Sequence, residues 1–244
     1  MTELNEKIAQ IVQQLPGQIA VLVENENSHV VFQTANLHHQ FKSASLIKLG
    51  IASFIKQSAN LNKQIKLRPA ELVPGGVLYH LEQRTWSVHD LLDLMLSVSD
   101  NTAANALINL QGRAATNVWL NQHYSDIYLG RYLMEQTDRE NYLSAATAMQ
   151  IFQEILSDQT DFGKTCQTAL FNQTTRSKLI ANLPEGRSYN KTGELADAEH
   201  DIARIFKGKH FFDCCVMSQF ENWEQRRQII LGMNEIGRLL YQNL

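Results

Sequence analysis

Runs of β-forming residues lie at both ends of this chain, and a long stretch with helical periodicity separates them. Near the N-terminus the runs are QIAVLVEN (18–25) and HVVFQTAN (29–36), around a polar turn. Near the C-terminus they are SYNKTGEL (188–195), DIARIFKG (201–208) and HFFDCCVMSQ (210–219), the last two joined by a tight GK turn. This order predicts an antiparallel sheet assembled from both termini, with a helical insertion.

Apolar periodicity predicts the helices of the chain. They are expected at 3–14, from about 45, and at 88–98, 102–110, 114–121, 144–156, 174–182 and 223–240. We therefore expect a single domain, 1–244, of the α/β class (α+β type). Its discontinuous α/β lobe would comprise about 1–60 and 185–244, and its helical lobe about 61–184.

The composition is that of a globular protein with enough apolar chain for a large core. Of the 244 residues, 44% are hydrophobic and 19% charged, and the net charge is −3. No basic run and no apolar stretch of about 18 residues occurs, so neither nucleic acid nor a membrane is an expected partner. The N-terminus lacks the features of a signal peptide, which predicts a cytoplasmic location. We expect a monomer.

Cysteines and histidines give no sign of a disulfide or a metal site. Cys166, Cys214 and Cys215 are odd in number and two are adjacent, so they are expected to fill the core. The eight histidines lack metal-ligand spacing. No metal or other cofactor is expected.

Within FKSASLIKLGIASF (41–54), the residues from Ser45 to Phe54 are almost all apolar or small, and Lys48 is the one charged residue among them. A helix that is apolar all round is usually buried, and a buried ammonium is costly unless it is paired or its pKa falls. Ser45 lies three residues earlier, on the same helix face. A lysine that has lost its proton could activate this serine as a nucleophile. The alternative is a lysine that extends from a half-buried helix to solvent.

Two further polar motifs follow in the sequence. Ser99, Asp100 and Asn101 interrupt an apolar helix, and Ser99 or Asp100 could simply cap the next helix. Lys191-Thr192-Gly193 lies in a β-rich run, where glycine often marks a close approach and the other two could hold a carboxylate. The alternative for this motif is an edge strand protected by a lysine.

Together, SxxK, SDN and KTG in this order resemble the motifs of class A β-lactamases and penicillin-binding proteins. FKSASLIK, SDNTAAN and the HDIARI that follows KTG extend the resemblance, which covers nearly the whole chain. It implies a β-lactamase/transpeptidase-like fold: an antiparallel sheet packed by terminal helices, an all-helical lobe, and the site between them.

The resemblance also implies roles for individual residues. Ser45 would attack a lactam or peptide-like carbonyl to give an acyl-enzyme, with Lys48 as proton acceptor and Ser99 as proton relay to the leaving nitrogen. Asn101 would bind the amide side chain of the substrate.

The KTG segment would bind the other end of the substrate. Lys191 and Thr192, followed by Gly193, would hold a carboxylate. The backbone N–H groups of Ser45 and Glu194 would form the oxyanion hole. The chemistry implied needs no cofactor.

This sequence departs from the class A pattern in the loop that carries the deacylating glutamate. Glu140 gives Glu-x-x-Leu-Ser where class A enzymes have Glu-x-x-Leu-Asn, and Glu135 is a second candidate by its distance from Ser99. Both could instead be surface glutamates. If the segment that begins at Ser144 follows a shortened loop, the deacylating base is absent.

Two smaller departures lie in and after the KTG motif. Glu194 puts a carboxylate where small or uncharged residues are usual, and it could offset the attraction of Lys191 for a substrate carboxylate unless it points into solvent. His200 replaces a more usual asparagine, and we expect it to be a core or surface histidine.

Three functions are consistent with these motifs. The first is a serine hydrolase, acylated by β-lactam antibiotics or peptide-like substrates, whose deacylation is slow. The second is a D-amino-acid peptidase or esterase of the same fold, which the absence of a leader favours, because cell-wall peptides lie outside the membrane. The third is a ligand-binding homologue with weak catalysis.

Overall fold

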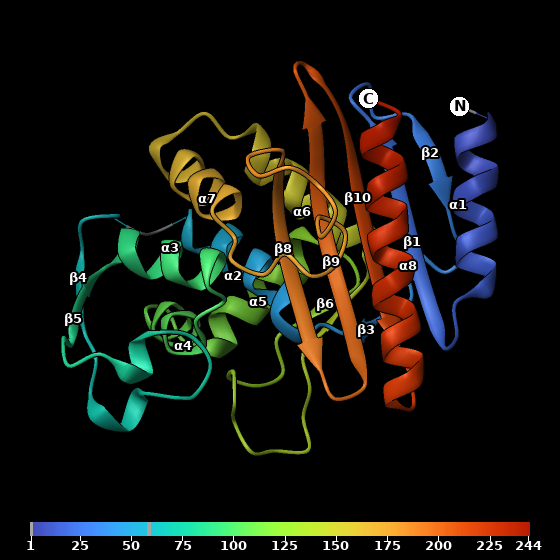
Figure 1. Cartoon of the computed structure of the whole chain (residues 1–244). Helices are drawn as coiled ribbons and strands as arrows, with labels where there is room; N and C mark the ends of the chain where they lie inside the picture. Colours follow the sequence, from blue (N-terminus) through green and yellow to red (C-terminus); the bar gives the residue numbers. More distant parts are fainter. Residues whose placement is uncertain (1, 58–59) are drawn as a thin grey trace.

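The computed structural model describes residues 2–57 and 60–244 and has an α+β architecture around one five-stranded antiparallel sheet (Figure 1). The strand order is β2-β1-β10-β9-β8. These strands are β1 (Gln18–Asn25), β2 (Val30–Gln33), β8 (Ser188–Leu195), β9 (Ala198–Lys207) and β10 (His210–Gln219). β1 pairs with β10 along its whole length, from Gln18 opposite Gln219 to Asn25 opposite Phe212. The two ends of the chain therefore build one sheet, as the sequence predicts.

Helices cover both faces of this sheet. α1 (Thr2–Gln14) and α8 (Trp223–Gln242) lie side by side on the outer face, where α8 packs against β9 (Figure 1). The remaining helices form the lobe on the inner face, where α6 packs on β1 and β10. They are α2 (Ile47–Ile55), α3 (Val88–Ser97), α4 (Asn101–Asn109), α5 (Arg113–His123), α6 (Ala145–Ser157) and α7 (Asp161–Phe171). Within the described residues, no helix is long and apolar enough to cross a membrane.

Short elements connect the helices. The 3₁₀ helices are η1 (Ala44–Leu46), η2 (Pro69–Glu71) and η3 (Leu78–His80). One small sheet contains β3 (Phe41–Lys42), β7 (Tyr142–Leu143) and β6 (Ile127–Tyr128), and the other contains β4 (Gln64–Lys66) and β5 (Thr85–Ser87). β3 leads directly to η1, so the small sheet fixes the start of the buried helix α2.

Alternating side chains of the central strands divide the interior into two cores. Val21 and Val23 of β1 pack toward α1 and α8, whereas Ala20 and Leu22 pack toward the helical lobe. The same alternation places the adjacent, unbonded cysteines of β10 in different cores. This two-residue period follows from the pleat of a strand that is buried on both faces. All three cysteines are buried, as expected.

One predicted helix does not form, and one helix of the structure was not predicted. Residues 174–182 form turns, not a helix, because distant groups take their amide hydrogens: Thr174 N–H donates to the Ser97 carbonyl, and Leu179 N–H to the Asp201 carboxylate. Helix α7 was missed; its N-cap Thr160 accepts a hydrogen bond from Gly163 N–H at 3.2 Å. The second predicted strand is also shorter than expected, since β2 covers only four residues.

Candidate active site

Ser45 lies in η1, where the edge strand β8 meets the start of α2. Ala44, immediately before it, has a left-handed backbone with φ of +47°. This conformation costs a non-glycine residue on the order of 1 kcal/mol or more. All nine residues of α2 are buried, whereas Ser45 is half-buried. The turn therefore presents the hydroxyl at the boundary of a rigid core.

Lys48 is fully buried and reaches both serines of the predicted site. Its Nζ lies 3.1 Å from Ser45 Oγ and 3.1 Å from Ser99 Oγ. It also donates to the Ser99 carbonyl and to Asn101 Oδ1, each at 2.7 Å. The alternative of a lysine that extends to solvent does not apply to this side chain.

The hydrogen-bond partners of Lys48 determine where its N–H groups and its lone pair can point. Both 2.7 Å contacts are to carbonyl oxygens, which only accept, so they use two N–H groups. Besides these two N–H groups and the bond to carbon, the nitrogen has one remaining direction, and it faces the hydroxyls of Ser45 and Ser99. Burial lowers the pKa of Lys48 to about 7, although the Asp100 carboxylate acts in the opposite sense. When neutral, the amine has a lone pair in this direction to accept a hydroxyl proton.

The SDN segment separates into a structural and a site-facing part. Asp100 caps α4, accepting from Ala103 N–H at 2.8 Å, and also accepts from the N–H groups of Val77 and Leu78. Capping therefore accounts for one of the three polar residues. Ser99 has φ of +58°, which turns its hydroxyl and carbonyl toward Lys48.

KTG is the third motif, and β8 carries it. Lys191 Nζ donates to Ser99 Oγ at 3.0 Å and to the Thr192 carbonyl at 2.8 Å. Burial and the nearby ammonium groups of Lys48 and Lys178 hold the pKa of Lys191 well below its usual value. Thr192 itself is nearly fully buried. Ser99 Oγ therefore lies between two amines, from α2 and from β8.

Gly193 lets β8 approach η1 closely. A Cβ at this position would lie 3.1 Å from Ala44 Cβ, 3.2 Å from His200 Cδ2 and 3.3 Å from Leu46 N. The glycine of this motif thus serves backbone packing beside Ser45.

Glu194 directs its carboxylate away from Lys191. Its side chain, 58% exposed, pairs with Arg226 of α8. Arg226 also bonds Glu199 at 2.6 Å. The negative charge next to KTG is therefore partly neutralised by the outer helix.

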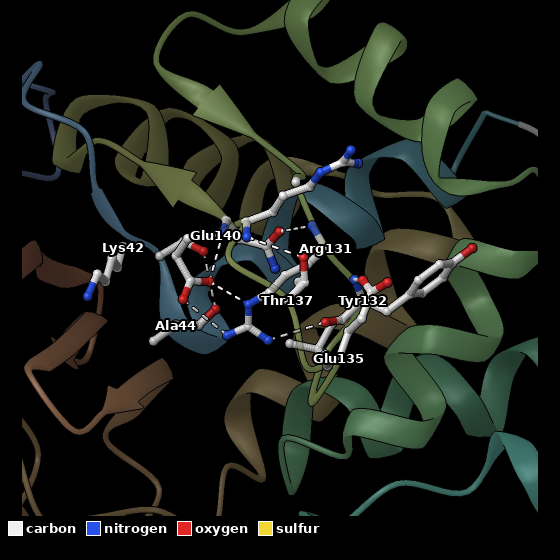
Figure 2. A network of polar contacts seen from close by, with 12 residues as sticks. Lys42, Ala44, Arg131, Tyr132, Glu135, Thr137 and Glu140 are labelled. Carbon is white, nitrogen blue, oxygen red and sulfur yellow. Dashed lines mark hydrogen bonds and ion pairs between the residues drawn. The ribbon is translucent and has the colours of Figure 1, made fainter.

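Both candidate deacylating glutamates are engaged by arginines in one loop network (Figure 2). Arg131 Nε donates to Glu140 Oε1 at 2.8 Å, and Asn141 N–H donates to the same oxygen. Glu135 accepts from Tyr132 N–H at 2.8 Å and pairs with Arg113 at 3.2 Å. Neither carboxylate makes a hydrogen bond to the serines or lysines described above.

His200 is a core residue, as expected. Its Nε2 lies 2.8 Å from the Lys42 carbonyl, and its Nδ1 accepts from Ser218 N–H at 3.1 Å. These partners require a neutral ring protonated on Nε2, and burial lowers the pKa of His200 to about 4. It has no acid–base partner at the site.

Sequence reasoning missed two residues that support the site. Asn105, one turn after Asn101, accepts from Leu133 N–H at 2.8 Å and donates to its carbonyl at 3.0 Å. Lys178 is buried behind β8 and donates to the Gly193 carbonyl at 2.8 Å. The second N in SDNTAAN was a signal for Asn105; the mistaken helix at 174–182 concealed Lys178. Among the described residues, no group of three or more His, Cys, Asp and Glu could hold a metal ion.

The sequence pattern of the β-lactamase enzyme family (Beta-lactamase2) matches residues 3–244. The chain belongs to the β-lactamase enzyme family. This confirms the class A β-lactamase-like family and the α+β fold that the motifs predict. No curated protein sequence matches the chain.

Solved structures share this β-lactamase-like fold over nearly the whole chain. A β-lactamase from Sphaerobacter thermophilus DSM 20745 is 24% identical, with a TM-score of 0.80 over 99% of this chain and 96% of that one. PBP-A is 19% identical (TM-score 0.84; 100% and 96%), and one of its point mutants is an acyl-enzyme complex with penicillin G. An ancestral class A β-lactamase is 21% identical (TM-score 0.83; 99% and 100%).

Proposed function

We propose that the protein is a serine hydrolase that is acylated at Ser45 by β-lactams or peptide-like substrates and is deacylated slowly. The observation that carries this proposal is the position of Lys48. Its fully buried amine lies 3.1 Å from both Ser45 Oγ and Ser99 Oγ, and its pKa is about 7. A base with a pKa near the working pH is the best compromise for general base catalysis.

In the acylation step, Ser45 Oγ bonds to the carbonyl carbon while the C–N bond of the substrate breaks. The proton of Ser45 passes to neutral Lys48 and, through Ser99, to the leaving nitrogen. Asn101 binds the amide side chain of the substrate, and Lys191 with Thr192 binds its carboxylate. The N–H groups of Ser45 and Glu194 stabilise the oxyanion. No cofactor enters this scheme.

Slow deacylation is supported by the loop between 129 and 144. Glu140 and Glu135 are held by Arg131 and Arg113, and Asn105 fixes the loop backbone at Leu133, a buried apolar residue. A water near the acyl ester would therefore lack a free carboxylate to remove its proton. We propose an acyl-enzyme that persists with penicillins.

A second candidate is an esterase or D-amino-acid peptidase that acts on a non-lactam substrate. Glu194 favours the esterase, because a carboxylate beside the KTG segment weakens attraction for the carboxylate of a penicillin or of a D-amino-acid peptide. A weakly catalytic binder is the third possibility, and it would have little use for a buried lysine with a lowered pKa.

Labelling with a fluorescent penicillin tests the proposal. Wild type and the control Ser53→Ala, whose hydroxyl bonds Tyr124 at 2.7 Å, should be labelled, and Ser45→Ala should not. Label on Ser45→Ala would refute the assignment of the nucleophile. A D-Ala-D-Ala peptide and a simple ester, tested in parallel, distinguish the second candidate; activity that survives in Ser45→Ala would refute both.

A further inference from the structure

We propose that Lys178 positions and polarises the peptide group whose N–H, from Glu194, stabilises the oxyanion. This inference rests on the proposed function, and it gives Lys178 a positioning role without contact with the substrate.

Lys178 is buried on the far side of the KTG strand, and its polar contacts all lie there. It is 2% exposed, and its Nζ donates to the carbonyls of Gly193 at 2.8 Å and His200 at 3.1 Å. The third contact is an ion pair with Glu199, which is fully buried. All of these partners are protein groups, and the amine is buried among them.

The Gly193–Glu194 peptide links Lys178 to the site. The described residues contain no cis peptide, so the carbonyl of Gly193 and the N–H of Glu194 point in opposite directions. Lys178 and β9 occupy the carbonyl side. β8 is an edge strand, and its other edge approaches η1. The N–H of Glu194 is thereby aimed toward the turn that carries Ser45.

A cation on the carbonyl also makes the amide a stronger donor. Hydrogen bonds in series polarise one another, and their electrostatic effect is larger inside a protein than in water. Glu199 holds Lys178 in place, and Arg226 contacts both Glu199 and Glu194. The network thus restrains the Gly193–Glu194 peptide at the Gly193 carbonyl and at the Glu194 side chain.

A test compares Lys178→Met with Lys56→Met, a control whose partly exposed amine pairs with Asp158 at 2.9 Å. We expect acylation of Lys178→Met by benzylpenicillin to slow about 10- to 100-fold, with little change in the initial binding constant. Loss of a whole oxyanion donor has a comparable or larger effect. The carbonyl stretch of the acyl-enzyme, measured by infrared difference spectroscopy, should move to higher wavenumber. Lys56→Met should match wild type.

The infrared band separates positioning from general stability, because a purely structural defect would not weaken the hydrogen bond to the acyl carbonyl. If Lys178→Met does not fold, Lys178→Met/Glu199→Gln, which leaves no unpaired charge on Glu199, takes its place. Normal acylation with an unshifted band in the folded variant would overturn the inference alone. A wild-type protein that benzylpenicillin and a simple ester both fail to acylate would instead refute the proposed function.

Discussion

Acylation of Ser45 should rise with pH because Lys48 must be neutral to accept its proton. With a pKa of about 7, the neutral fraction of Lys48 is about 3% at pH 5.5 and about 97% at pH 8.5. The acylation rate constant should therefore increase about 30-fold over this range, with its midpoint near pH 7. A lysine with an ordinary pKa near 10.4 would show a tenfold rise for each pH unit without a plateau.

Stopped-flow acylation by benzylpenicillin and by an uncharged ester would measure this profile. Both reagents are needed because Lys191, which also has a lowered pKa, would bind the carboxylate of benzylpenicillin, a group that the ester lacks. Lys48→Arg, whose guanidinium stays protonated, should lose acylation at every pH. A flat profile for the ester, or a rate that still rises steeply above pH 8.5, would refute Lys48 as the general base.

Three further predictions follow from the same contacts. Lys48 binds its proton more weakly when folded, so wild type should gain about 2–3 kcal/mol of unfolding free energy relative to Lys48→Met between pH 6 and pH 9; an unchanged difference in urea titrations would contradict the lowered pKa. Glu194→Gln should accelerate acylation by penicillin about threefold at low salt but leave an uncharged ester unaffected; equal effects on both would exclude attraction through Lys191. Glu140→Gln should leave the acyl-enzyme lifetime within about twofold while it lowers stability by about 1 kcal/mol through the contact with Arg131; a much longer lifetime would make Glu140 the deacylating base.

The sheet could be predicted because its strands are long and their neighbours are polar turns. QIAVLVEN, SYNKTGEL and HFFDCCVMSQ are strands with the predicted bounds. Residues 174–182 could not be predicted, since their amides bond to Ser97 and Asp201, groups distant in the sequence. Tertiary hydrogen bonds replaced the helix that apolar spacing favoured.

The candidate site residues in the three motifs could be predicted from the sequence. The contacts of the residues that support them could not. The i to i+3 spacing predicted that the side chains of Ser45 and Lys48 would meet. The direction of Glu194 could not be predicted, because its partner Arg226 lies on α8, 32 residues later. Lys178 was missed for the same reason, since its contact with Glu199 joins a turn to a strand.

The most direct test of the account is intact-protein mass spectrometry of wild type and Ser45→Ala during incubation with benzylpenicillin, sampled from seconds to hours. If Ser45 is acylated and deacylation is slow, wild type should gain the mass of one whole penicillin, the adduct should persist for minutes or longer, and Ser45→Ala should gain nothing. Consumption of penicillin at about 10 s⁻¹ or faster with no persistent adduct would contradict it.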